Sequence, residues 1–212
     1  MAFLNDVSVS EDKDKWQWAP DNSGRFSTSS FKSLFSIAPD SGQMYRLWKG
    51  GWILSKCDIF IWRAYQDRIP TRHALARRNI PVASTECILC GEANETVDHL
   101  FSICRIAASV WEKISEWVKI PPIFAFSFRD ILSIHEGVGA NRKTKDIIRG
   151  LIMIACWCIW KARNEKYFSS GKGCSAEIFG EVESLGYLWL KCRSIHKGIV
   201  WSEWCNSPLY ML

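Results

Sequence analysis

Three cysteines and one of the four histidines lie between residues 87 and 104, in the pattern C-x2-C-x8-H-x4-C. The four residues are Cys87, Cys90, His99 and Cys104. Two thiolates three positions apart on a tight turn can face one ion. Gly91 comes directly after Cys90, at a position where such a turn often needs the backbone freedom of glycine. Zn²⁺ accepts three sulfurs and one imidazole nitrogen in tetrahedral geometry. The spacing therefore predicts a zinc site, which would fix two stretches of backbone against each other.

Three other interpretations of this cluster remain open. A catalytic cysteine needs a base and an orienting group, but here three thiols compete and no glycine-rich oxyanion loop is evident. A thioredoxin-like C-x-x-C needs a strand-to-helix turn, whereas residues 80–86 (IPVASTE) read as a loop. Ordinary buried thiols are the third alternative, because free cysteine is among the most buried residues. We expect such core positions for the remaining cysteines: Cys57, Cys156, Cys158, Cys174, Cys192 and Cys205.

The redox setting favours metal binding. The first residues carry no basic, apolar export signal, so we expect an intracellular protein of the nucleus or cytoplasm that is not secreted. Nine cysteines in such a compartment do not predict a disulfide framework. The most apolar run, at residues 151–160, is shorter than the roughly 18–20 residues that cross a bilayer, so no membrane partner is expected.

The chain is predicted to be mainly α, with an N-terminal β-hairpin plus helices around a zinc knuckle, followed by a C-terminal helical sub-domain. Trp16 and Trp18 alternate as on a strand, residues 21–24 (DNSG) favour a turn, and Phe26 would begin the return strand. A short helix carrying Phe31, Leu34 and Phe35 would follow.

Apolar periodicity predicts the other helices. An interrupted helix is expected over residues 45–66, a short one between Thr71 and Pro81, an amphipathic one over 106–118, a long one over 144–168 and a last one over 176–193. In one continuous helix His99 and Cys104 would point about 140° apart, since each residue turns about 100°. We therefore expect a helical turn at 99–101, a kink, and Cys104 at the start of the next helix. The predicted division is a zinc-binding domain at 14–118, an irregular linker at 119–143 and a helical segment at 144–212.

A basic stretch surrounds the short helix. Arg68, Arg72, Arg77 and Arg78 form a candidate face for phosphate contacts, which Lys56 and Arg63 would adjoin. The formal net charge is +5, which permits binding of RNA or DNA but equally fits a solvated face that binds nothing. Trp62 could stack on a base, although tryptophans at helical spacing are more often core.

The order of these features resembles the reverse-transcriptase zinc-binding domain of plant non-LTR (LINE-type) retrotransposons, where that domain follows the polymerase. The residues that carry the resemblance are Trp16, Trp18, Gly24, Phe26, Ser27, Trp62, Pro70, Thr71, Leu75, Arg77, Arg78, Cys87, Cys90, Glu95, His99, Leu100, Phe101, Cys104 and Trp111. Residues 160–164 (WKARN) and Phe168 look like the segment that follows this domain. The resemblance implies the same four zinc ligands as the spacing.

The resemblance also bears on activity. The parent family includes an RNA-directed DNA polymerase, whose two-metal chemistry needs clustered carboxylates. The chain has no Asp-Asp dipeptide and no aspartate after Asp146, so neither polymerase nor RNase H catalysis is expected from it. We expect a C-terminal fragment without the polymerase, whose partners are nucleic acid or a reverse-transcriptase polymerase domain and not a small-molecule substrate. The alternatives are a structural or protein-interaction module, or a decayed retroelement product.

Overall fold

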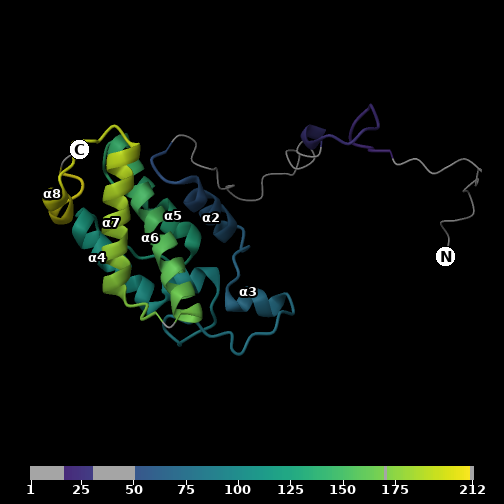
Figure 1. The fold of residues 1–212 in the computed structure, drawn as a ribbon, viewed down its shortest axis with the longest axis horizontal. Coiled ribbons are helices and arrows are strands. Elements are labelled where there is room, and N and C mark those ends of the chain that lie inside the picture. Colours follow the sequence, from purple (N-terminus) through teal and green to yellow (C-terminus); the bar gives the residue numbers. More distant parts are fainter. Residues whose placement is uncertain (1–16, 31–50, 170, 211–212) are drawn as a thin grey trace, which may run out of the picture. The chain divides into compact units, whose positions relative to one another are not determined.

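The computed structural model describes residues 17–30, 51–169 and 171–210. The chain divides into two compact units, Met1–Met44 and Tyr45–Leu212. The helices of the second unit are α2 (Ser55–Tyr65), α3 (Arg72–Arg77), η1 (His99–Ile103), α4 (Arg105–Val118), α5 (Phe128–Gly137), α6 (Arg142–Phe168), α7 (Ser175–Arg193) and α8 (Trp201–Asn206), and most are labelled in Figure 1.

The predicted N-terminal β-hairpin is wrong, because residues 17–27 form no strand and the described residues hold no sheet. The turn itself exists: Gly24 has a φ of 66°, and the Trp18 N–H donates to the Gly24 carbonyl over 2.9 Å. Trp18 and Phe26 then meet edge to face, with ring centroids 5.0 Å apart. A two-stranded ribbon alone is marginal in water, and the described residues provide no third strand that could stabilise one here. Trp16 and the helix expected around residues 31–35 lie outside the described residues.

α6 is the central helix of the second unit. It packs against α2, α4, α5 and α7, and Figure 1 shows it in the middle of these helices. Its apolar run at residues 151–160 leaves few polar positions, so the helix is buried on several sides. One continuous hydrophobic core results, extending in sequence from Trp52 to Trp204. Residues of the predicted segments 14–118 and 144–212 thus share a core, and the proposed division between them stays a prediction.

Most of the helices expected from periodicity are confirmed, but of the interrupted helix expected over residues 45–66 the described residues contain only α2, and residues 45–50 lie outside them. α4, α6 and α7 begin and end within two residues of the predicted bounds. Thr71 caps α3, since its hydroxyl accepts from the Ala74 N–H over 3.2 Å. α3 ends at Arg77, four residues before Pro81, and Asn79 adopts a left-handed φ of 57°.

Residues 119–143, assigned to a linker from sequence, contain α5. Ser127 and Asp130 form a capping box at its start. Phe128 and Ile131 are buried in the common core, and the Phe128 N–H donates to the Asp98 carboxylate over 2.7 Å. α5 therefore packs on η1 and α6 and supports the segment that carries His99.

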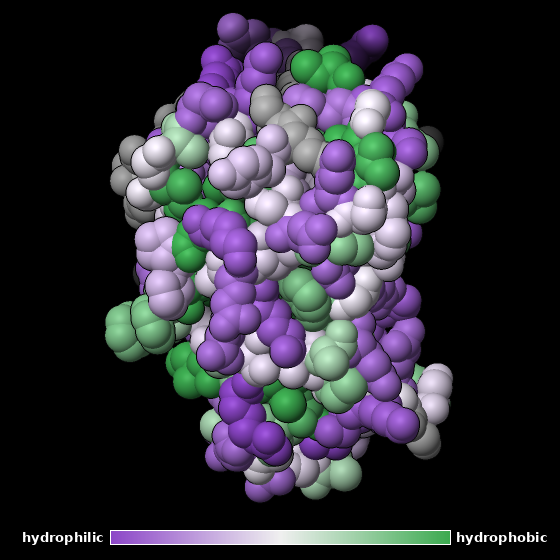
Figure 2. Space-filling model, turned by 90° about the vertical axis from the view of Figure 1, so that its left-hand side faces the viewer, coloured by the Kyte–Doolittle hydropathy of each residue, from purple (hydrophilic) through white to green (hydrophobic). Residues whose placement is uncertain are grey.

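In the part of the chain that the structure describes, no helix has the length and apolarity to cross a membrane. Figure 2 shows the side of the molecule on which α8 lies: hydrophilic side chains cover much of it, and hydrophobic ones form small separate patches.

Candidate metal centre

A tight loop presents the first two cysteines. Glu86 and Asn94 form an antiparallel bridge, and the Cys87 N–H donates to the Ala93 carbonyl over 2.7 Å. The Gly91 N–H donates back to the Cys87 carbonyl over 2.7 Å, with Gly91 at a φ of +73°. This left-handed conformation favours glycine and turns the chain so that Cys87 and Cys90 face the same side.

A single turn of π-helix, η1, presents His99. The Cys104 N–H donates to the His99 carbonyl over 2.7 Å, which closes the wider turn. Cys104 then has a φ of −60° and a ψ of 128°, which is extended backbone, and α4 begins at the next residue. The Phe101 carbonyl is satisfied by the indole N–H of Trp111 over 2.7 Å. The predicted break between His99 and Cys104 is confirmed.

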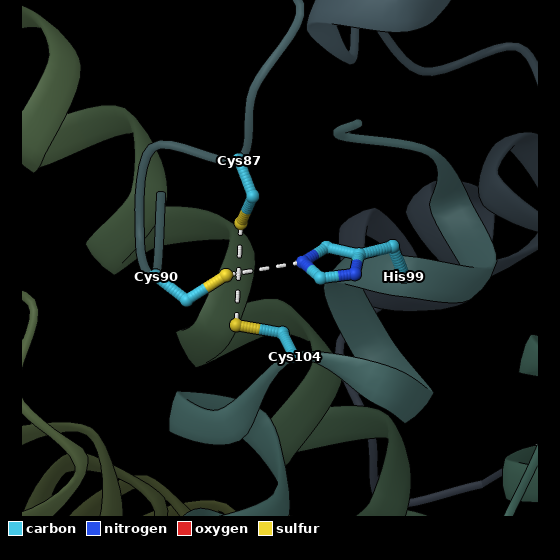
Figure 3. A group of neighbouring side chains, drawn as sticks. All are labelled: Cys87, Cys90, His99 and Cys104. Carbon is cyan, nitrogen blue, oxygen red and sulfur yellow. Dashed lines mark hydrogen bonds between the residues drawn. The ribbon is translucent and has the colours of Figure 1, made fainter. Parts of the chain in front are cut away.

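The four side chains converge on one point, as Figure 3 shows. The Cys87 and Cys104 sulfurs are 4.0 Å apart, the Cys90 sulfur lies 3.2 Å from His99 Nε2, and the four atoms all lie within 4.8 Å of one another. Zinc–ligand bonds of about 2.3 Å to sulfur and 2.0–2.1 Å to nitrogen imply tetrahedral edges of about 3.8 Å between sulfurs and 3.6 Å from sulfur to nitrogen. The separations match these edges to within about an ångström, so a zinc ion fits after small side-chain shifts.

Backbone N–H groups surround the sulfurs. The backbone N–H groups of Leu89 and Cys90 act to lower the pKa of Cys87, and those of Ile106 and Ala107, in the first turn of α4, act to lower the pKa of Cys104. The Glu92 N–H lies 3.5 Å from Cys90 Sγ. Donors of this kind stabilise thiolates and orient metal ligands. The donor set is thus prepared for the deprotonated sulfurs that zinc requires.

Two of the cysteines are joined by a hydrogen bond between their sulfurs, 4.0 Å apart. Cys87 donates to Cys104, which lowers the pKa of Cys104 and, together with burial, raises the pKa of Cys87. Burial lowers the pKa of His99, which favours the neutral imidazole that binds a metal. Three sulfurs and one neutral imidazole in a closed tetrahedron are characteristic of structural zinc sites.

The remaining cysteines lie outside this cluster. The predicted core positions are confirmed for Cys57, Cys156 and Cys158, which are fully buried. Burial raises the pKa of Cys57 to about 12, so its thiol stays protonated at neutral pH. Cys174 and Cys205 are half-buried, and Cys192 is exposed, so its predicted core position is wrong.

Sequence reasoning missed a buried ion pair next to the cluster. The carboxylate of Glu95 is fully buried and accepts from Nε and Nη2 of Arg163 over 3.1 and 2.7 Å. It also accepts from the backbone N–H groups of Arg72 and Ile88, over 2.9 and 3.2 Å. Glu95 therefore joins α3, the cysteine loop and α6. Both residues belong to motifs of the family resemblance, but nothing in the sequence pairs them.

The four arginines predicted to contact phosphate do not form one uniform face. Arg77 forms an ion pair of 2.6 Å with Asp67, and Arg78 donates to the Asp67 carbonyl over 3.4 Å. Arg72 donates to the Glu86 carbonyl over 3.0 Å and lies over the ring of Tyr167. Arg68 is exposed. The structure thus directs Arg72 toward α6 and the other three toward solvent near Asp67.

Comparison with known proteins places the cluster in a family context. Searches of curated proteins and of solved structures gave no match. Residues 26–111 match the family described as zinc-binding in reverse transcriptase, and all four converging side chains lie within that range.

Proposed function

We propose that this chain is a non-catalytic module that binds one Zn²⁺ through Cys87, Cys90, His99 and Cys104. The convergence of these four side chains is the observation that carries the proposal. Four protein ligands leave no open position for substrate, which is typical of a structural ion. Zinc would join the loop at residues 87–91 to the start of α4, and its binding free energy would contribute to folding.

Metal analysis of purified protein tests this proposal. We expect one zinc per chain in the parent and little in His99→Ala or Cys104→Ser. Cys192→Ser is the matched control, because this exposed thiol lies outside the cluster, and it should keep its zinc. A parent protein that takes up no zinc when refolded with the metal would reject the proposal.

We further propose that the module derives from a plant non-LTR retrotransposon and binds nucleic acid inside the cell. The family match, the net charge of +5 and the exposed Arg68 and Arg78 support this. Reverse transcription itself would be carried out by a separate polymerase domain. Gel shifts with structured RNA and with DNA at rising salt are the test, since each phosphate contact steepens the salt dependence. Replacing both Arg68 and Arg78 with alanine should weaken binding, and no shift even at low salt would exclude this role.

A protein-interaction role is the second candidate. Phe124 and Phe126, between α4 and α5, are 84% and 86% exposed, and exposed aromatic rings are common anchors of protein interfaces. The proposed partner is a reverse-transcriptase polymerase domain. Co-purification with such a domain, lost in Phe124→Ser/Phe126→Ser while zinc is retained, would favour this role. Failure of the two proteins to co-purify would reject it.

A further inference from the structure

A cavity of about 420 Å³ lies where α2 and the start of α3 meet the second half of α6. Its size falls within the range of small-ligand sites, about 300–1,000 Å³. The residues that line it are Lys56, Ile59, Phe60, Arg63, Ile69, Pro70, Arg72, Leu75, Trp157, Trp160, Arg163, Asn164, Tyr167 and Phe168. All come from the second unit, and none of them belongs to the Cys/His cluster.

The charge of this cavity is positive. None of the described residues that line it carries a carboxylate. The guanidinium of Arg163 is neutralised by Glu95, but Lys56, Arg63 and Arg72 have no described carboxylate within ion-pair distance. Three cations around one cavity attract an anionic ligand and disfavour a cationic or neutral apolar one.

The walls of the cavity are aromatic. Trp157 and Trp160 pack around Phe60, with ring centroids 5.4 and 5.8 Å from it. Tyr167 and Phe168 lie at the rim, where they are 48% and 75% exposed. Cations already lie over two of these rings: Lys56 Nζ is 5.4 Å from the Trp157 centroid, and Arg72 is 5.6 Å from that of Tyr167. A flat ring with an adjoining anionic group matches this arrangement.

We propose that this cavity binds a nucleotide unit of single-stranded nucleic acid. The base stacks on the exposed ring of Phe168, and the phosphates on either side contact Lys56, Arg63 and Arg72. Asn164, whose amide oxygen accepts from Arg163 over 2.9 Å, keeps its amide N–H groups for a carbonyl of the base. The proposal rests on the proposed nucleic-acid binding and adds the cavity between α2 and α6 as a binding site besides Arg68 and Arg78. A paired base is already stacked within a duplex, so the site prefers a single strand.

Fluorescence anisotropy of a labelled 12-nucleotide RNA tests the site, using the zinc-loaded full chain. Phe168→Ala should weaken binding roughly 5- to 160-fold, the range for losing one base–aromatic stack. Lys56→Glu should weaken it by at least as much and reduce its salt dependence. A duplex of the same length should bind more weakly than the single strand. Phe168 and Lys56 are exposed, so zinc content and circular dichroism should not change.

Lys143→Glu is the matched control. It makes the same charge change at the other end of α6, about 36 Å from Tyr167 along the helix axis, and should bind like the parent. If Phe168→Ala and Lys56→Glu bind RNA like the parent, the inference about the cavity is overturned. The proposed function would still stand if the Arg68/Arg78 double variant binds RNA poorly. Inorganic polyphosphate that competes as well as RNA also overturns it, because the rings would then contribute nothing. A parent that binds no nucleic acid rejects both proposals.

Discussion

Arg163 on α6 donates two hydrogen bonds to one carboxylate oxygen of Glu95, although the two residues lie 68 positions apart in the chain. Their side chains are 4% and 0% exposed. Trp160 and Tyr167 lie under the guanidinium, 5.0 and 5.3 Å from it. The pair therefore connects the cysteine loop to the central helix inside the core. The Cys/His cluster is thus part of the helical core and does not form a separate zinc-finger-like unit.

Glu95→Ala should destabilise the protein by about 3–5 kcal/mol, because Arg163 would remain buried without its carboxylate. The N–H groups of Arg72 and Ile88 would lose their acceptor as well. Urea denaturation in the presence of zinc measures the change. The control is Glu181→Ala, which removes a partly exposed ion pair with Lys161 and should cost less than about 1 kcal/mol. Equal losses in the two variants would contradict the role assigned to Glu95.

Gly91→Ala should weaken zinc binding without a steric clash. A Cβ at Gly91 would meet nothing within 4 Å, so only the φ of +73° opposes the substitution. Left-handed backbone costs an alanine about 1–2 kcal/mol, which corresponds to roughly 5- to 30-fold in zinc affinity. Gly91→Asn should lose less, since asparagine adopts this region more readily. Competition with a chromophoric chelator measures the affinity, and the control Gly139→Ala, also in open space, should match the parent.

Gly150→Ala should destabilise the protein, although alanine is the better helix former. The new Cβ would lie 2.2 Å from Cζ2 of Trp52, whose ring is buried. Overpacking of this kind costs about 1–3 kcal/mol. Gly180→Ala is the opposite case on α7: nothing lies within 4 Å, so the variant should gain about 0.5–1 kcal/mol. Thermal unfolding midpoints that move in the same direction for the two variants would contradict this assignment.

The convergence of the Cys/His cluster could be predicted from sequence because its four residues are close in the chain. Cys87 and Cys90 share one loop, and the break between His99 and Cys104 follows from helical geometry alone. α6 and α7 could be predicted for the same reason, since apolar periodicity is a local signal. The hairpin prediction was wrong because alternation and a good turn favour strands but do not supply the neighbours that stabilise them.

The contacts between distant segments could not be predicted. The ion pair of Glu95 and Arg163 and the cavity between α2 and α6 depend on how helices pack, which local patterns do not specify. Phe168 was noticed only as part of the family resemblance, and nothing in the sequence marked Tyr167 or Phe168 as a ligand contact, because exposed aromatic residues at a helix end are common. The arginines of α3 were correctly placed on a helix, yet sequence could not show that Arg77 pairs with Asp67.

Acidification should destabilise the protein in part through His135. Burial lowers the pKa of this imidazole and nearby Arg149 lowers it further, against the raising effects of the Leu132 carbonyl, Glu136 and Asp146. Because the pKa is lower in the folded state, the unfolded chain binds a proton first as the pH falls below about 6.5. Stability is therefore full above this pH and declines below it.

His135→Gln removes this titration. Urea denaturation of parent and variant at pH 8 and at successively lower pH isolates the contribution of His135, because both proteins keep the same zinc ligands. We expect the difference in unfolding free energy to be constant above about pH 6.5 and to shift in favour of the variant below it. If the unfolding free energies of parent and variant run parallel over the whole pH range, the imidazole titrates equally in the folded and unfolded states. The partial burial of His135 would then have no electrostatic consequence.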